Sequence, residues 1–284
     1  MTLSLAIGLG GIVVMLALIL AGMRVAFAAG LVGFAGLALL RGFDPAAGLA
    51  GLLVTSEVSH FALSVVPLFV LIGYLSFHAG LTQGAFAAAR AWFGRLPGGL
   101  AVSSVFAAAG FAAVSGASTA TSAVFARIAI PEMLKSGYDP KLAGAVVAVG
   151  GTLAALIPPS AILVLYGVIV EQSVGALLLA GLIPGLITAV VYAGVCIGTV
   201  RRNPNLALAE PAVSWAKKFK ALSEAGGLLA VIVIIVVGLY TGWMTPTEVG
   251  GVGAFLVFCM AIARRATTRA DIVQALVDTA KLTA

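Results

Sequence analysis

The sequence predicts an all-α polytopic membrane protein, and two observations support this prediction. Hydrophobic residues make up 62% of the 284 residues, only 9% are charged, and the mean hydropathy is +1.17. A soluble domain needs far more polar residues to cover its surface. In addition, apolar runs recur along the chain, several close to the ~20 residues that cross a bilayer core. These runs cover residues 3–22, 25–40, 61–77, 143–170, 176–200, 228–243 and 249–263.

The basic residues predict how the chain is oriented in the lipid bilayer. The formal net charge is +6, but the Lys and Arg residues lie in short segments between apolar runs, so we expect no nucleic-acid partner. If the N-terminus is outside, every Lys and Arg is cytoplasmic except Arg41, which is outside, and Arg127, which lies within a segment. This orientation requires residues 98–136 to enter and leave the membrane from the cytoplasmic side.

Residues 98–136 are therefore predicted to form a re-entrant helical hairpin. Its ascending limb is residues 100–114, its tip is the SGAST sequence at residues 115–119, and its descending limb is residues 120–133. Limbs of about 15 residues, at ~1.5 Å rise per residue, are too short to cross ~30 Å of hydrocarbon. The hairpin should reach only partway across the membrane.

The residues of the tip suggest a cation site. A broken helix leaves unpaired carbonyl and amide groups, which need polar partners at membrane depth. Gly116 allows a turn conformation closed to other residues, and Ser118 or Thr119 is expected to N-cap the descending limb. The free carbonyls and the Ser115 hydroxyl can then coordinate a hard cation. The alternative is a packing motif of small residues, which does not explain the basic flanks.

A second interruption lies in the helix expected over residues 140–170. The sequence GGTLAALIPPS, residues 150–160, places paired glycines and paired prolines inside an apolar run. Proline disrupts the helical hydrogen bonds, and one proline alone would give a simple kink. Together, the interrupting residues favour an opened, discontinuous helix of the kind that builds transporter sites. They are Gly150, Gly151, Thr152, Pro158, Pro159 and Ser160.

These interruptions also carry a family resemblance. The sequences SGASTATSAVFARIAIPEM, GYDPKLAGAVVAVGGTLAALIPPSAILVLYG and TPTEVGGVGA resemble the large membrane subunit (M, DctM-type) of tripartite ATP-independent periplasmic (TRAP) transporters. The resemblance implies an inverted-repeat, elevator-type importer in the bacterial inner membrane, with a periplasmic N-terminus. It implies sodium as the coupling ion, with no other cofactor, and C4-dicarboxylates, sialic acid or similar carboxylates as substrates. The implied partners are a small four-helix membrane subunit (Q type) and a periplasmic substrate-binding protein (P type).

The same resemblance, with the two interruptions facing each other, implies which residues bind sodium and which bind the substrate. Because sodium takes about six oxygens, neither break could supply its whole shell. The expected sodium-binding residues are Ser115, Gly116, Ser118, Thr119, Gly150, Gly151, Thr152 and Pro158. The expected substrate-binding residues are Ser118, Thr119, Pro159 and Ser160.

The resemblance also suggests how the chain is divided. A complete M subunit has a second inverted repeat with its own hairpin and broken helix, and here that repeat begins but is incomplete. Residues 1–97 are expected to form the scaffold helices of the first repeat with an amphipathic arm, and residues 98–200 half of a transport domain. That half comprises the hairpin 98–136, the broken helix 140–170 and the helix 176–200. A cytoplasmic linker with an amphipathic segment (201–227) and the scaffold helices of the second repeat (228–284) follow.

Other features point away from chemistry. Arg127 is expected to extend toward the cytoplasmic interface or to pair with Glu132. Thr245 and Glu248 have the spacing of a capping box.

An enzyme is not expected, because no histidine lies within a span to activate a serine and no phosphate-binding loop is present. The alternatives to a carrier are a truncated, non-transporting scaffold and, less favoured, a passive channel.

Overall fold

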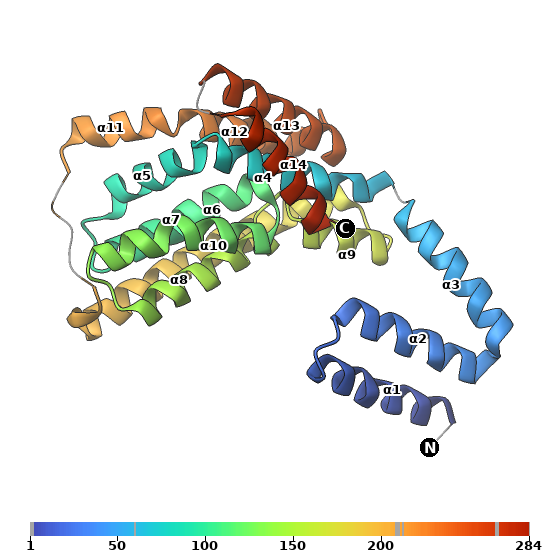
Figure 1. The fold of residues 1–284 in the computed structure, drawn as a ribbon. Coiled ribbons are helices and arrows are strands. Elements are labelled where there is room, and N and C mark those ends of the chain that lie inside the picture. Colours follow the sequence, from blue (N-terminus) through green and yellow to red (C-terminus); the bar gives the residue numbers. More distant parts are fainter. Residues whose placement is uncertain (1–2, 60, 208–210, 212, 265–266, 284) are drawn as a thin grey trace. The chain divides into compact units, whose positions relative to one another are not determined.

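The computed structural model describes residues 3–59, 61–207, 211, 213–264 and 267–283, and these form helices and turns (Figure 1). The predicted all-α class is therefore confirmed. By packing, the chain divides into two units, residues 1–60 and 61–284. The first contains helices α1 (Leu3–Leu20), α2 (Val25–Arg41) and α3 (Phe43–Val58), with α2 packed against both α1 and α3.

The second unit holds the hairpin and the broken helix. Its α-helices are α4 (Val65–His78), α5 (Leu81–Phe93), α6 (Gly99–Ser115), α7 (Ser118–Lys135), α8 (Pro140–Thr152), α9 (Ala161–Ile169), α10 (Val174–Arg202), α11 (Trp215–Glu224), α12 (Gly226–Tyr240), α13 (Pro246–Ala263) and α14 (Arg269–Thr283). Three short 3-10 turns, η1 (Phe61–Ser64), η2 (Leu153–Ala155) and η3 (Pro204–Leu206), complete the described helical segments.

Helix α6 is the centre of the second unit. Only Phe106 and Gly110 among its 17 residues are not buried, because α4, α5, α7, α8, α10 and α12 all pack against it. The sequence explains this position, since a helix that is apolar on every side must be covered on every side. Its Ala, Gly and Ser residues let neighbouring backbones approach closely. The hairpin therefore begins from the best-packed element of the unit.

Several helices have the length and composition of membrane spans. Among the described residues, α1, α10 and α13 qualify singly, and the number rises to five if each of two bent helix pairs counts as one span. The pairs are α4 with α5, bent by 72°, and α11 with α12, bent by 60°. These spans agree with the predicted multi-pass membrane class.

The helices are interrupted at both predicted places. Helices α6 and α7 form a helical hairpin, and the run over residues 143–170 is broken between α8 and α9. The amphipathic segment of the linker is α11. The Thr245 and Glu248 capping box is present, with the Thr245 amide donating to Glu248 Oε2 at 2.7 Å and the Glu248 amide to Thr245 Oγ1 at 3.4 Å.

Candidate functional site

The hairpin tip and the opened segment of the broken helix meet along their backbones. Gly116 ends α6 in the left-handed conformation, with φ of +61°, as its role in the turn requires. Its carbonyl oxygen accepts a hydrogen bond from the amide of Ala161, the first residue of α9, at 2.8 Å. A Cβ on Gly116 would lie 2.6 Å from the carbonyl oxygen of Pro159. Glycine is therefore needed both for the turn and for the close approach.

The N-cap of the descending limb lies before the residues that were expected to form it. Ala117, in extended conformation, is the N-cap of α7 and makes no side-chain capping bond. The prediction that Ser118 or Thr119 caps this helix is therefore wrong. Two residues, Gly116 and Ala117, are enough to reverse the chain, so Ser118 and Thr119 already belong to the first turn of α7. Their hydroxyls are left for other uses.

The Ser115 hydroxyl lies inside the hairpin. Ser115 is fully buried, and its Oγ is 3.0 Å from the Oγ1 of Thr121, whose hydroxyl donates to the Ala117 carbonyl at 2.9 Å. On the other side Gly73 of α4 approaches so closely that an added Cβ would lie 2.6 Å from the Cβ of Ser115. This hydroxyl pair joins the two limbs directly below the turn.

The clearest candidate for an ion ligand is Ser118. Its Oγ is buried, and it makes no hydrogen bond with the described residues. Facing this turn of α7 is Gly151 of α8, where an added Cβ would meet the Ser122 side chain and, at 3.2 Å, the carbonyl oxygen of Ser118. The Ser122 hydroxyl and this carbonyl thus lie beside the end of α8. A buried hydroxyl without a hydrogen bond is costly, which makes Ser118 a candidate ligand of an ion or other polar group.

The other predicted residues of α8 face different neighbours. Gly150 packs on α6, since an added Cβ would lie 3.3 Å from the Cβ of Ala108. Thr152 points toward α10: its hydroxyl donates to the Val149 carbonyl at 2.6 Å and is 3.2 Å from the Tyr192 hydroxyl. The Thr152 side chain is therefore not brought together with the hairpin tip.

The opened segment ends in a capped helix. Pro158 and Pro159 are buried, and Ser160, also buried, is the N-cap of α9. The Ser160 hydroxyl accepts from the Leu163 amide at 3.3 Å and donates to the Ala155 carbonyl at 2.9 Å. Both bonds hold the opened segment in shape. Pro159 reaches the hairpin through its backbone carbonyl.

Four helix ends converge at this junction. The C-terminal ends of α6 and α8 present carbonyl groups, while the N-terminal ends of α7 and α9 present amides. Carbonyl ends carry partial negative charge and favour a cation, whereas amide ends favour an anion. The junction can therefore hold both kinds of ligand.

Sequence reasoning missed Thr121 and Ser122, although their spacing of three and four residues from Ser118 places them on its face of α7.

Arg127 does not pair with Glu132, and that part of its prediction is wrong. Glu132 Oε2 is 2.9 Å from Arg90 Nη1 on α5, and its Oε1 is 3.3 Å from Lys135 Nζ. Arg127 instead lines a cavity of about 110 Å³ with Tyr74 and Asp278, among others, and a second of about 500 Å³ that reaches Arg90 and Lys135. The descending limb therefore faces space lined by both basic and acidic side chains.

A family described as "Tripartite ATP-independent periplasmic transporter, DctM component" matches residues 12–284. The C4-dicarboxylate TRAP transporter large permease protein DctM of Vibrio cholerae is 37% identical over 215 residues, which is 76% of this chain and 47% of the relative. The sialic acid TRAP transporter large permease protein SiaM of the same organism is 32% identical over 276 residues, 97% of this chain and 64% of the relative.

A third relative, the isethionate TRAP transporter permease protein DctMQ of Oleidesulfovibrio alaskensis, is 34% identical over 209 residues, 70% of this chain and 31% of the relative. The chain spans less than two thirds of the length of each of these relatives. The matches with DctM and SiaM extend over most of this chain.

Proposed function

Because this chain belongs to the DctM family of tripartite ATP-independent periplasmic transporters, we propose that it acts in the large permease subunit of a sodium-coupled secondary transporter that imports organic acids. The relatives are named as permease proteins, for C4-dicarboxylate, sialic acid and isethionate, and not as enzymes. The observation that carries the proposal is the junction between Gly116 and Ala161, where two interrupted helices meet at 2.8 Å.

Sodium binds, on this proposal, at the carbonyl ends of α6 and α8. The buried Ser118 hydroxyl supports this placement, because a cation would give it the partner it lacks among the described residues. The Ser118 carbonyl and the Ser122 hydroxyl face Gly151. Hard cations such as sodium bind oxygen ligands of this kind. Ser115, Gly116, Thr119, Gly150, Thr152 and Pro158 remain proposed members of the site through backbone or side-chain oxygens.

The substrate carboxylate binds at the amide ends of α7 and α9. Ser118 and the exposed Thr119 lie in the first turn of α7, while Pro159 and Ser160 precede the first turn of α9. Helix N-termini stabilise anions through unpaired amides and the helix dipole. Since cation and anion would occupy opposite helix ends of one junction, each would favour binding of the other.

Coupling follows from the shared junction. A ligand shifts a conformational equilibrium only by its difference in affinity between two states. Sodium contacts both the hairpin and α8, so it favours the state in which they are together, with the substrate site formed. The elevator motion would then carry this half of the transport domain, residues 98–200, across the membrane relative to the scaffold.

The proposal includes two partners and a location. A small four-helix membrane subunit and a periplasmic substrate-binding protein would complete the transporter in the bacterial inner membrane. The name DctMQ of one relative agrees with a close association between the M and Q components. The distribution of basic residues supports a periplasmic N-terminus, because this orientation would put nearly all of them in the cytoplasm.

Reconstitution in proteoliposomes tests this function. The transporter carrying these residues is reconstituted with the small subunit, and uptake of radiolabelled succinate or sialic acid is measured with and without the binding protein and a sodium gradient. We expect saturable uptake that requires both. Passive, unsaturable flux would indicate a channel, and partner binding without uptake of any organic acid would indicate a non-transporting scaffold.

A further inference from the structure

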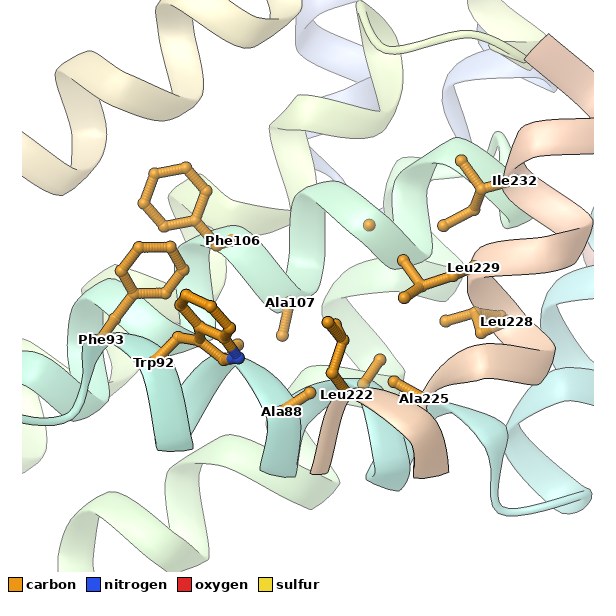
Figure 2. Close-up of a pocket in the computed structure, with 13 residues that line it drawn as sticks. Ala88, Trp92, Phe93, Phe106, Ala107, Leu222, Ala225, Leu228, Leu229 and Ile232 are labelled. Carbon is orange, nitrogen blue, oxygen red and sulfur yellow. The ribbon is translucent and has the colours of Figure 1, made fainter. Parts of the chain in front are cut away.

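Another cavity, away from the junction, lies between α5, α6 and the bend between α11 and α12. Its volume is about 260 Å³. In Figure 2, aromatic side chains of Trp92, Phe93 and Phe106 lie at one end and the aliphatic Leu229 and Ile232 at the other. The other lining residues are Ala, Gly and Leu. Since no charged side chain or hydroxyl lines this cavity, it does not suit a carboxylate or sodium.

A cation lies at the aromatic end of this cavity. Lys218 Nζ is 5.6 Å from the ring centroid of Trp92 and 4.8 Å from that of Trp215. The Trp92 ring also makes edge contacts with Trp215 and with Phe219, each at 6.1 Å between centroids. Trp92 thus belongs both to the cavity wall and to this cluster, so a positive charge lies next to one wall of the cavity.

Helix α11 has the composition of a helix that lies in the membrane interface. Lys217, Lys218 and Lys220 are three of its 10 residues, and Trp215 and Phe219 are exposed by 66% and 59%. Basic residues combined with exposed aromatic ones are typical of interfacial helices that bind anionic lipid. The charge next to the cavity therefore selects an anionic occupant with an apolar portion.

We propose that this cavity holds an acyl chain of an anionic phospholipid whose phosphate is bound by Lys218. A protein helix, about 10 Å wide with its side chains, is a bulky occupant for a cavity of about 260 Å³. An alkyl chain is narrower and has no polar group to satisfy. Charge complementarity with Lys218 then places the headgroup.

The position of the lipid gives it a structural role. The bends of α4 with α5 and of α11 with α12 cross closely, since an added Cβ on Gly84 would lie 3.2 Å from the carbonyl oxygen of Glu224. The cavity lies beside this crossing, between α5, α11 and α12. A bound acyl chain fills the space between the two bent pairs and stabilises their packing on α6.

Thermal unfolding of the delipidated protein in neutral detergent tests the proposal. Phosphatidylglycerol is titrated against phosphatidylcholine with the same acyl chains. We expect phosphatidylglycerol to raise the unfolding midpoint at lower concentration than phosphatidylcholine. Lys218→Gln should weaken the apparent affinity for phosphatidylglycerol by about fivefold and that for phosphatidylcholine by less, because the choline cation of the latter already offsets its phosphate charge. Lys141→Gln, an exposed lysine on α8, is the matched control and should not change either.

A cavity-filling variant tests the acyl-chain part separately. Gly110 lines the cavity, and an added Cβ would meet no atom within 4 Å, so Gly110→Leu should fold and fill the space. It should abolish the lipid-dependent shift, whereas Gly144→Leu, an equally open helical glycine on α8, should not. Equal effects of both lipids would overturn the proposal. So would a Gly110→Leu variant that keeps the lipid shift but loses binding of the small membrane subunit, since the cavity would then be a protein contact.

Discussion

A Cβ atom on Gly116 would lie 2.6 Å from the carbonyl oxygen of Pro159, so the hairpin tip and the opened segment touch backbone to backbone. No flexible side chain separates them, and neither segment can move toward the other. The amide of Ala161 fixes the same contact through its bond to the Gly116 carbonyl. Any side chain at Gly116 must therefore push the two interruptions apart.

We predict that Gly116→Ala destabilises the protein more than Gly80→Ala. Both glycines have positive φ, +61° and +72°, so alanine should cost about 1 to 2 kcal/mol at either position. Only Gly116→Ala adds a clash, because Gly80 has open space around an added Cβ. Tryptophan fluorescence during thermal unfolding in detergent measures the difference. Equal losses for both variants would contradict the close backbone contact.

A second prediction concerns Gly151 and Ser122. Gly151→Ala places its Cβ against the Ser122 side chain, so we expect it to be destabilising. Ser122→Gly removes that side chain and should cost up to about 1 kcal/mol alone through helix propensity. In the double variant the clash is relieved, so the two losses should not add; the coupling energy should be about 0.5 to 3 kcal/mol. Additive losses in a double-mutant cycle would mean that α8 moves away from α7 instead.

A third prediction separates the two serines of the tip. Ser118 has a buried hydroxyl without a described partner, whereas the Ser115 hydroxyl is 3.0 Å from that of Thr121. Ser118→Ala should therefore weaken sodium binding by the worth of one ligand, about 1 to 3 kcal/mol, with little loss of stability in potassium. Ser115→Ala should lower stability in either salt, because it leaves a buried threonine hydroxyl with one partner fewer.

The measurement is the unfolding midpoint as a function of sodium chloride, with potassium chloride keeping the ionic strength constant. Ser223→Ala, which removes an exposed hydroxyl on α11, is the control and should behave as the parent protein. If the parent midpoint does not respond to sodium, or if Ser118→Ala keeps the parent's half-saturating concentration, the ion site does not include this hydroxyl.

Much of the fold was predictable because the chain is apolar almost everywhere. Against that background Gly116 and the Pro158, Pro159 pair stand out, and their backbone restrictions require interruptions where the structure has them. Facing of the two breaks was also expected. What local patterns could not determine was which atoms meet: that Ala161 bonds to Gly116, or that Gly151 faces Ser122, depends on how separate helices pack.

The error about Arg127 has a geometric cause. Residues five apart on a helix differ by about 140° around its axis, so Arg127 and Glu132 point in different directions. Glu132 pairs with Lys135, at the favourable spacing of three, and with Arg90, which is 42 residues away and reaches it only through the packing of α5. The misplaced cap at Ser118 is similar, because the sequence does not reveal how short a turn can be.

The last prediction is topological, and it tests the orientation on which the re-entrant hairpin depends. Arg95 lies just before α6 and Lys135 ends α7, and both are exposed. If residues 98–136 form a re-entrant hairpin, cysteines at these two positions should react with a membrane-impermeant maleimide only from the cytoplasmic side. A cysteine beyond α9 should react only from the periplasmic side. Gln172, which is exposed, is the site used there.

The labelling needs a background without Cys196 and Cys259, since Cys259 is exposed. Whole cells and inverted membrane vesicles are labelled in parallel, with Arg95→Cys, Lys135→Cys and Gln172→Cys as separate variants. We expect the first two to be modified in inverted vesicles and the third in whole cells. Modification of Arg95→Cys and Lys135→Cys from opposite sides would make residues 98–136 a complete membrane crossing. Residues 115–119 would then not be the tip of a re-entrant hairpin, and the proposed coupling between the hairpin and the opened segment would be wrong.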